Sequence, residues 1–198
     1  MIELYEFALS GNCHKVRLML SFVGLSYKSI IVNGSARDHK SREFLAMNPL
    51  GQLPVINDEG VVIRDSQAIL IYLAHRYGGE AWWPKDSGTL AKITAWLFTA
   101  SNEVARGPNA LRLHHKFGRP INSVEAEQIT ETLLNIMEEH LSSYDWIALD
   151  TPTIADVALY PYIALAHEGK VDISRFPSVV AWLKRFKALP GYVSMPGM

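Results

Sequence analysis

Three residues whose side chains could support thiol chemistry lie together near the start of the chain. Ser10, Asn12 and Cys13 follow a predicted strand and stand where a predicted helix begins. A hydroxyl group and the positive end of a helix dipole both favour the charged form of a sulfur atom nearby. Cys13 could itself react, because a cysteine near a helix N-terminus can have a lowered pKa. A lone cysteine is also often a small buried hydrophobe, so both interpretations of Cys13 stay open here.

A second polar pair, Asp65 and Ser66, opens another predicted helix. Both residue types favour helix N-termini, so plain capping explains them without any ligand. A helix start also offers free backbone N–H groups, which together with a serine hydroxyl can bind a carboxylate. The carboxylate of Asp65 could in turn accept hydrogen bonds from an ammonium group.

The residues around Ser10 are positioned by a predicted β-α-β unit. Residues 2–7 alternate in part between apolar and polar, and residues 27–32 are β-branched and aromatic, so both segments predict strands. Between them, apolar residues at i, i+3, i+4 and i+7 predict one face of a helix that Gly24 ends. These apolar residues are Val16, Met19, Leu20 and Val23. The order implies a parallel pair of strands with a right-handed crossover.

The residues around Asp65 are positioned by a predicted hairpin. After a polar stretch, a short helix is expected over 43–47, and residues 48–54 form a loop with two prolines and a glycine. Residues 54–56 and 61–63 flank an Asp-Glu-Gly turn, which predicts a hairpin ahead of the helix that starts at Asp65. The first part of the chain therefore has the pattern βαβ-αββα.

After residue 87 the pattern is entirely helical. Helices are predicted over 90–114, with an interruption near Gly107-Pro108, then over 124–141 and 178–189. Another helix should begin at Thr153, where Thr-Ile-Ala-Asp resembles a capping box. Glycine and proline residues between the two patterns predict a linker. We therefore expect domains over 1–77 and 88–198, joined by residues 78–87.

Three stretches of the sequence resemble the cytosolic glutathione transferase superfamily. They are SGNCHKVR (10–17), NPLGQLPV (48–55) and DSQAI (65–69), and their order and spacing are those of the family. The resemblance covers almost the whole chain. It implies a thioredoxin-like α/β N-terminal domain, an all-α helical bundle as C-terminal domain, and a homodimer.

The resemblance implies that Ser10 stabilises the thiolate, with Asn12 as a helper. Ser10 matches the serine of serine-type transferases such as the theta and zeta classes. Asn12 matches a functional asparagine of bacterial nu-class enzymes and a cysteine of the beta class. Tyr5 lies within the first strand rather than after it, which disfavours a tyrosine-type enzyme. Cys13 stays the alternative if the reaction is thiol exchange.

The resemblance also implies which residues hold the two substrates. The expected glutathione-binding residues are His39, Lys40, Gln52, Leu53, Pro54, Asp65 and Ser66. Pro54 is expected in the cis form, so that the backbone of Leu53 can pair with an extended peptide. The expected electrophile pocket includes Trp96, Arg106 and Asn109.

The resulting hypothesis is an enzyme that activates glutathione, as co-substrate, for attack on a small hydrophobic electrophile in detoxification. A glutathione-dependent disulfide or peroxide reductase and a non-catalytic binding module are the alternatives. The chain has 19 basic and 20 acidic residues with no basic stripe, so we expect neither nucleic acid nor membrane as partner. The start does not read as a signal peptide, and the single cysteine fits a reducing compartment, so we expect a cytoplasmic protein. The histidines show no metal-ligand spacing, and we expect no metal.

Overall fold

The computed structural model describes residues 1–198, and its first part is a four-stranded sheet with the strand order β2-β1-β3-β4. Strand β1 (Ile2–Glu6) pairs in parallel with β2 (Tyr27–Ile31) and antiparallel with β3 (Val55–Asp58). Strand β4 (Val61–Arg64) completes the hairpin with β3 and forms one edge of the sheet. The predicted parallel pair and hairpin are therefore confirmed.

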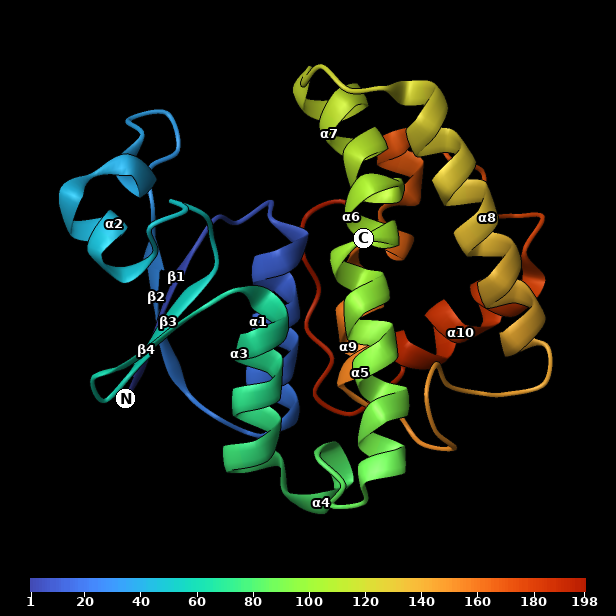
Figure 1. Cartoon of the computed structure of the whole chain (residues 1–198), viewed down its shortest axis with the longest axis horizontal. Coiled ribbons are helices and arrows are strands. Elements are labelled where there is room, and N and C mark those ends of the chain that lie inside the picture. The colour runs from blue at the N-terminus through green and yellow to red at the C-terminus, as the bar shows by residue number, and fades with distance from the viewer.

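Helices cover both faces of this sheet (Figure 1). Helices α1 (Gly11–Phe22) and α3 (Ser66–Leu73) pack together on the face that turns toward the second half of the chain. The 3-10 turn η1 (Asp38–Lys40) and helix α2 (Arg42–Met47) lie on the opposite face, where Phe44 is buried in a small cluster. Helix α1 begins directly after its N-cap Ser10, so Asn12 lies in its first turn.

Between the two halves the chain is more helical than expected. The π-helical segment η2 (Ala74–Gly78) and the short helix α4 (Gly79–Trp82) occupy the first half of the predicted linker, residues 78–82. Gly79, at the junction of these two turns, has a φ angle of +62°, which glycine adopts without a steric penalty. The indole ring of Trp82 stacks on Phe22 of α1 with 5.4 Å between ring centroids, so this segment is packed against the first half of the chain.

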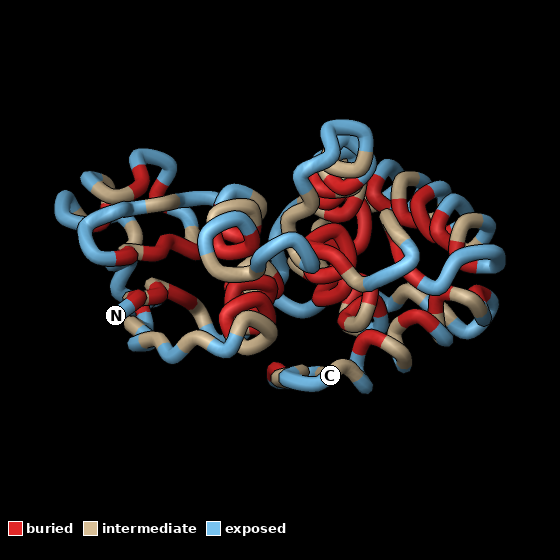
Figure 2. Tube along the Cα trace, turned by 90° about the horizontal axis from the view of Figure 1, so that it is seen from below, coloured by how far each residue is buried: buried red, intermediate tan, exposed pale blue.

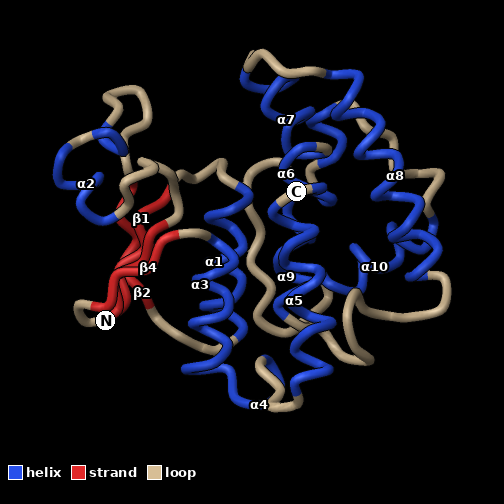
Figure 3. The backbone as a smooth tube through the Cα atoms, viewed as in Figure 1, coloured by secondary structure: helices blue, strands red, loops and turns tan.

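The second half is all helical, as predicted (Figure 3). Its elements are α5 (Ser87–Ser101), α6 (Glu103–Arg106), α7 (Pro108–Phe117), α8 (Ser123–Leu141), α9 (Ile154–Ala164), η3 (Ala166–Gly169) and α10 (Pro177–Lys187). On α8 the buried face includes Leu133, Leu134 and Met137, whereas Ile136 is 51% exposed. Ile136 therefore points away from the neighbouring helices.

One hydrophobic core runs through both halves of the chain. Helix α9 is its centre: every residue except Ala164 is buried, and the helix packs against α1, α3, α5 and α10. Figure 2 shows the buried segments continuing from the sheet and α1 into the helical part. The capping box at the start of α9 is confirmed, with Thr153 as N-cap and Asp156 bonded back to it. No helix has the length and apolar character that crossing a membrane would require.

Candidate functional site

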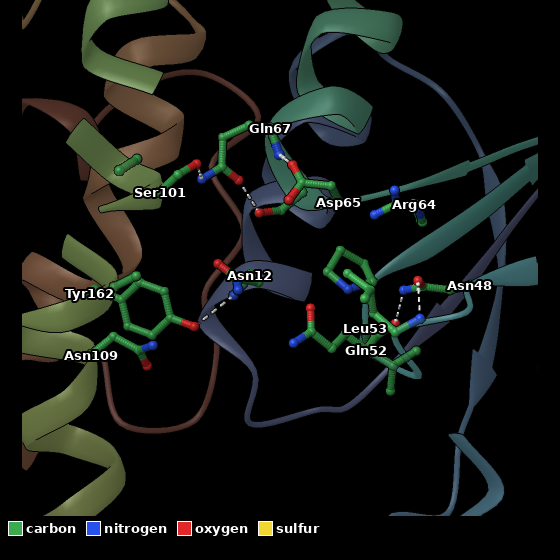
Figure 4. Close-up of a pocket in the computed structure, with 15 residues that line it drawn as sticks. Asn12, Asn48, Gln52, Leu53, Arg64, Asp65, Gln67, Ser101, Asn109 and Tyr162 are labelled. Carbon is green, nitrogen blue, oxygen red and sulfur yellow. Dashed lines mark hydrogen bonds between the residues drawn. The ribbon is translucent and has the colours of Figure 1, made fainter. Parts of the chain in front are cut away.

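A polar cleft lies where the first half of the chain meets the helical half (Figure 4). The start of α1, the loop 48–54 and the β4–α3 junction form one side, and residues of α5, α6, α7 and α9 form the other. Many of the predicted site residues line it, which are Asn12, Gln52, Leu53, Pro54, Asp65, Ser66 and Asn109. The segments that carry the resemblance in the sequence thus converge on one cleft.

Ser10 is the N-cap of α1 at the edge of this cleft. Its backbone is extended, and its Oγ accepts a hydrogen bond from the backbone N–H of Cys13 at 3.2 Å. The hydroxyl hydrogen of Ser10 has no acceptor in the chain and is free to donate. Ser10 is half-buried and is not among the lining residues, whereas the side chain of Asn12, two residues on, is.

Cys13 is fully buried and is not among the residues that line the cleft. Its Sγ accepts the backbone N–H of Phe7 at 3.4 Å, and burial raises the pKa of the thiol to about 11. A thiol that stays protonated and has no access to solvent is a poor nucleophile. The geometry therefore favours the interpretation of Cys13 as a small core residue.

Most backbone N–H groups at the start of α1 already have partners. The N–H of Asn12 donates to the hydroxyl oxygen of Tyr162 at 3.2 Å, and that of His14 donates to the carbonyl oxygen of Ser10 at 2.9 Å. The N–H of Cys13 is taken by the Ser10 hydroxyl. Gly11 is left with an N–H group that no atom of the chain accepts.

The loop 48–54 is held in place by Asn48 and Lys40. Asn48 Nδ2 donates to the carbonyl oxygen of Gln52 at 2.8 Å, and the backbone N–H of Leu50 donates to Asn48 Oδ1 at 3.1 Å. The ammonium of Lys40 donates to the carbonyl oxygens of Leu50 and Gly51 at 2.9 and 3.0 Å. The bond between Leu53 and Pro54 is cis, as expected. Lys40 thus lies behind the loop, and its ammonium supports the loop from outside.

His39 is not brought into the cleft lining. Its ring lies edge-on to Phe7 with 5.7 Å between centroids, and its Nδ1 is buried without a partner. Desolvation, followed by the charges of Lys40 and Arg37, lowers the pKa of the imidazole. The ring is therefore held in its neutral form, which is a weak group for attracting a carboxylate.

Asp65 caps α3 from a backbone conformation that few residues adopt. Its φ angle is +74°, and such strain is often found at functional sites. Oδ1 accepts the backbone N–H groups of Gln67 and Ala68 at 2.9 and 3.2 Å, which leaves Oδ2 without a partner beside the cleft. The Ser66 hydroxyl donates to the side-chain oxygen of Gln67, and Gln67 Nε2 donates to Ser101 of α5 at 2.8 Å. This chain of hydrogen bonds links the two walls of the cleft (Figure 4).

Two residues expected in the electrophile pocket lie elsewhere. The ring of Trp96 contacts His140 of α8 with 5.8 Å between centroids, and Arg106 forms an exposed ion pair with Glu125 at the start of α8. Both side chains turn toward α8, while the cleft is lined by Ala100, Ser101 and Ala105 of the same helical stretch. Of the three predicted residues, only Asn109 reaches the cleft.

Several lining residues were not predicted from the sequence. They are Asn48, Leu50, Arg64, Gln67, Ala100, Ser101, Ala105 and Tyr162. The pattern of Asn48 at the start of a Pro- and Gly-containing loop was a signal for the first of them. Tyr162 is 150 residues from its partner Asn12 in the sequence, and no pattern among its sequence neighbours indicates that it lines the cleft. No group of three or more His, Cys, Asp and Glu side chains is placed to hold a metal ion.

Comparison with known proteins gives the same assignment for both halves of the chain. Residues 4–81 match the family model of the glutathione S-transferase N-terminal domain, and residues 114–190 match that of the C-terminal domain. Glutathione S-transferase 3 of Zea mays is 31% identical over 205 residues, covering 96% of this chain and 91% of the relative. The disulfide-bond oxidoreductase YfcG of Escherichia coli is 28% identical over 202 residues, covering 96% and 92%.

Solved structures agree with these sequence matches. A glutathione S-transferase of Xanthobacter autotrophicus has a TM-score of 0.92 at 30% identity, covering 100% of this chain and 98% of that one. A glutathione transferase homologue from Drosophila mojavensis, solved with bound glutathione, has a TM-score of 0.86 at 29% identity and covers 96% and 88%. With both domain models matched and relatives aligned over nearly their full length, the chain belongs to the glutathione S-transferase family.

Proposed function

We propose that the cleft binds glutathione and that the enzyme uses its thiolate to attack a small hydrophobic electrophile. The observation that carries this proposal is the state of Ser10, whose oxygen is occupied by the Cys13 N–H while its hydrogen is free. Such a hydroxyl has its hydrogen available to donate, and a thiolate at the start of α1 would be an acceptor for it. Cleft-lining residues in the matching stretches support glutathione as the ligand.

The energetics of thiolate formation are within reach of this arrangement. Lowering a thiol pKa by two units takes about 2.7 kcal/mol of differential stabilisation. A hydrogen bond to a charged group contributes about 1.5–3 kcal/mol, and a helix N-terminus adds about 0.3–1 kcal/mol. Ser10 and the open end of α1 therefore suffice without the buried thiol of Cys13.

The charged ends of the tripeptide fit the other wall. The unpartnered Oδ2 of Asp65 suits the ammonium of the γ-glutamyl group, and the helix start at Ser66 suits its carboxylate. The backbone of Leu53 suits the extended cysteinyl segment, with Gln52 beside it. His39 lies outside the proposed site. Lys40 contributes to the site by holding the loop 48–54 in place. Asn109 lies on the electrophile side.

A disulfide reductase is the second candidate, and one observation favours it. Asn12, and not Ser10, lines the cleft, and Asn12 holds the position that resembles the nu class. The relative named a disulfide-bond oxidoreductase aligns over nearly the whole chain. In this alternative the same bound thiolate attacks a disulfide sulfur, forms a mixed disulfide with it and releases the other sulfur as a thiolate. No thiol of the protein takes part.

We also propose a cytoplasmic homodimer with a role in detoxification, made of domains over 1–77 and 88–198. Large apolar side chains are exposed on the edge strand β4, at Val61 and Val62, and on α5, where Phe98 is 70% exposed. A stable homodimer should bury well over ~1,000 Å² in total. Light scattering that gives a monomer at micromolar concentration would contradict the dimer.

The function is tested by retention on immobilised glutathione, followed by assays with a panel of electrophiles and disulfides. Asp65→Ala should abolish retention, because it removes the ammonium partner and the cap of α3. Asp86→Ala is the matched control: Asp86 caps α5 by accepting the N–H of Thr89 at 2.8 Å, away from the cleft. If Asp86→Ala reduces retention as strongly as Asp65→Ala, or if wild-type protein is not retained, the proposed site is wrong. Turnover of disulfides alone would establish the second candidate.

A further inference from the structure

Tyr162 is a buried phenol that reaches the cleft from the centre of the helical half. The residue is 5% exposed and lies on α9, yet it lines the cleft opposite the loop 48–54. Figure 4 shows its hydroxyl oxygen directed at the backbone of Asn12, at the start of α1. A side chain in this place is adjacent to the helix end where the proposed thiolate would sit.

The hydroxyl group of Tyr162 accepts a hydrogen bond but donates none within the chain. Its oxygen accepts the N–H of Asn12 at 3.2 Å, and no atom of the chain accepts its hydrogen. A buried tyrosine hydroxyl usually finds a partner, because an unpaired polar group loses its hydration without compensation. The free hydrogen therefore points to an acceptor that comes with the ligand.

The position of the ring is fixed by close packing. A Cβ atom on Gly11 would lie 2.7 Å from the Cζ atom of Tyr162, so the ring rests directly on the first residue of α1. The amine of Lys15, also on α1, lies over the ring at 5.4 Å from the centroid. A phenol held in this way keeps its hydroxyl at the helix end without an entropic cost when the ligand binds.

The surroundings keep the phenol protonated. Burial is the main cause that raises its pKa, and the charge of Arg112 on α7 acts in the opposite direction. On α1, Cys13 acts to raise the pKa of Tyr162, and the amine of Lys15 lies 5.4 Å from the ring centroid. The backbone N–H of Asn12, which donates to the hydroxyl oxygen, also acts to lower the pKa. At neutral pH Tyr162 is therefore a hydrogen-bond donor and not a base.

We propose that Tyr162 is a second catalytic donor, whose hydroxyl hydrogen bonds to the glutathione sulfur together with that of Ser10. This inference rests on the proposed function, since it needs glutathione in the cleft. Ser10 approaches the sulfur from the cap of α1, and Tyr162 approaches it from the helical half. The two hydroxyl groups flank Gly11, whose N–H is the open donor of the helix end.

The test is Tyr162→Phe, which keeps the ring against Gly11 and removes only the hydroxyl. Tyr160→Phe is the matched control, because Tyr160 is buried on the same helix and its hydroxyl bonds to that of Tyr192 at 3.0 Å, outside the cleft. The readout is the pH midpoint of thiolate absorbance in the ultraviolet for the enzyme–glutathione complex. A steady-state assay gives kcat and the KM for glutathione in parallel.

Loss of a donor to the thiolate should raise this midpoint by about one pH unit. Turnover below the midpoint should fall about tenfold, with little change in the KM for glutathione. Tyr160→Phe should leave the midpoint unchanged while affecting thermal stability at least as much. An unchanged or lowered midpoint in Tyr162→Phe, with wild-type protein retained on glutathione, overturns the role of Tyr162 alone. Absence of wild-type retention overturns the proposed function and this role with it.

Discussion

The hydroxyl oxygen of Ser10 accepts the backbone N–H of Cys13 at 3.2 Å, so one residue caps α1 and presents a free donor hydrogen. Ser10→Ala should remove both roles. We expect the thiolate midpoint of bound glutathione to rise by about one to two pH units, because a hydrogen bond to the charged form is lost. The measurement is the pH dependence of conjugation rate, and turnover near neutral pH should fall with a smaller effect on affinity.

The loss of a helix cap needs its own control in this experiment. Ser41 caps α2 by accepting the N–H of Phe44 at 3.2 Å, the same geometry in a place without a role in thiolate formation. Ser41→Ala should cost about 1 kcal/mol of stability, as Ser10→Ala does, and leave the pH profile in place. Cys13→Ala should leave the profile in place as well. If Cys13→Ala is inactive and Ser10→Ala is not, thiol exchange at Cys13 replaces the serine assignment.

Loss of activity in Asn12→Ala alone would favour the disulfide-reductase candidate. The side chain of Asn12 lines the cleft, whereas its backbone N–H is already bonded to Tyr162. Substitution by alanine therefore removes only the amide group and keeps the helix start intact. We expect a reduction of about tenfold or less in conjugation rate if Asn12 is a helper to Ser10. Comparing conjugation with disulfide reduction in the same variant separates the two functions.

Lys15 should make the stability of the protein depend on pH. The side chain is buried on α1 without a hydrogen bond or ion pair, and burial lowers its pKa from 10.5 to about 7. Below pH 7 both folded and unfolded chains carry the proton, so the full cost of a buried charge is present. Between about pH 7 and 10.5 the unfolded chain binds more protons, and the free energy of unfolding rises with pH.

Lys15→Met should therefore stabilise the protein by several kcal/mol below about pH 7, with a gain that fades toward pH 10. Urea unfolding at several pH values measures this gain. Lys92→Met, at an exposed position on α5, serves as the control and should have no such pH dependence. A Lys15→Met variant with the same pH dependence as the wild type would show that the amine is hydrated.

Asp156 should be essential for stability and not for binding. Its buried carboxylate accepts the N–H groups of Ile147 and Thr153 at 3.0 and 2.9 Å and the indole N–H of Trp182 at 2.9 Å. Asp156→Ala leaves these N–H groups without an acceptor, and each buried donor without a partner costs about 1–3 kcal/mol of stability. We expect a loss of several kcal/mol in urea unfolding, with the folded fraction still retained on glutathione. Asp150→Ala, at an exposed position of the same loop, should change neither, and unchanged stability in Asp156→Ala would refute the structural role.

Local patterns in the sequence were enough to predict the elements and one wall of the cleft. The Thr153–Asp156 spacing and the Asp58-Glu59-Gly60 turn each depend on residues within a few positions of one another, and both features are confirmed. Gln52, Leu53 and Asp65, which line this wall of the cleft, belong to short stretches whose resemblance could be read from neighbouring residues alone.

The opposite wall could not be predicted, because it depends on contacts between distant segments. Tyr162 lies beside Asn12 only once α9 packs on α1, and Ser101 lies beside Gln67 only once α5 packs near α3. Periodicity shows that Trp96 lies on a helix but not which neighbour its ring will face, and the structure places it against α8. The role of Cys13, as a reactive thiol or as a core residue, stayed open for the same reason. Whether a side chain at a helix start is buried depends on which distant segments pack over it.

The final prediction concerns Gly51, which lets the loop 48–54 lie close to η1. Gly51 has a φ angle of +58°, and a Cβ atom there would lie 2.6 Å from the carbonyl oxygen of His39 and from the ammonium of Lys40. Gly51→Ala must push the loop away from Lys40 and so displace Gln52 and Leu53 in the cleft. Because a displacement of about 1 Å can change binding and rate strongly, we expect the KM for glutathione to rise about tenfold or more.

Gly60→Ala is the matched control: its φ is +94° and nothing lies within 4 Å of the added carbon, so it carries backbone strain without a clash. That variant should lose about 1–2 kcal/mol of stability at the hairpin and keep the wild-type KM. Equal KM values for the two variants would show that the contact between Lys40 and the loop does not position the glutathione site.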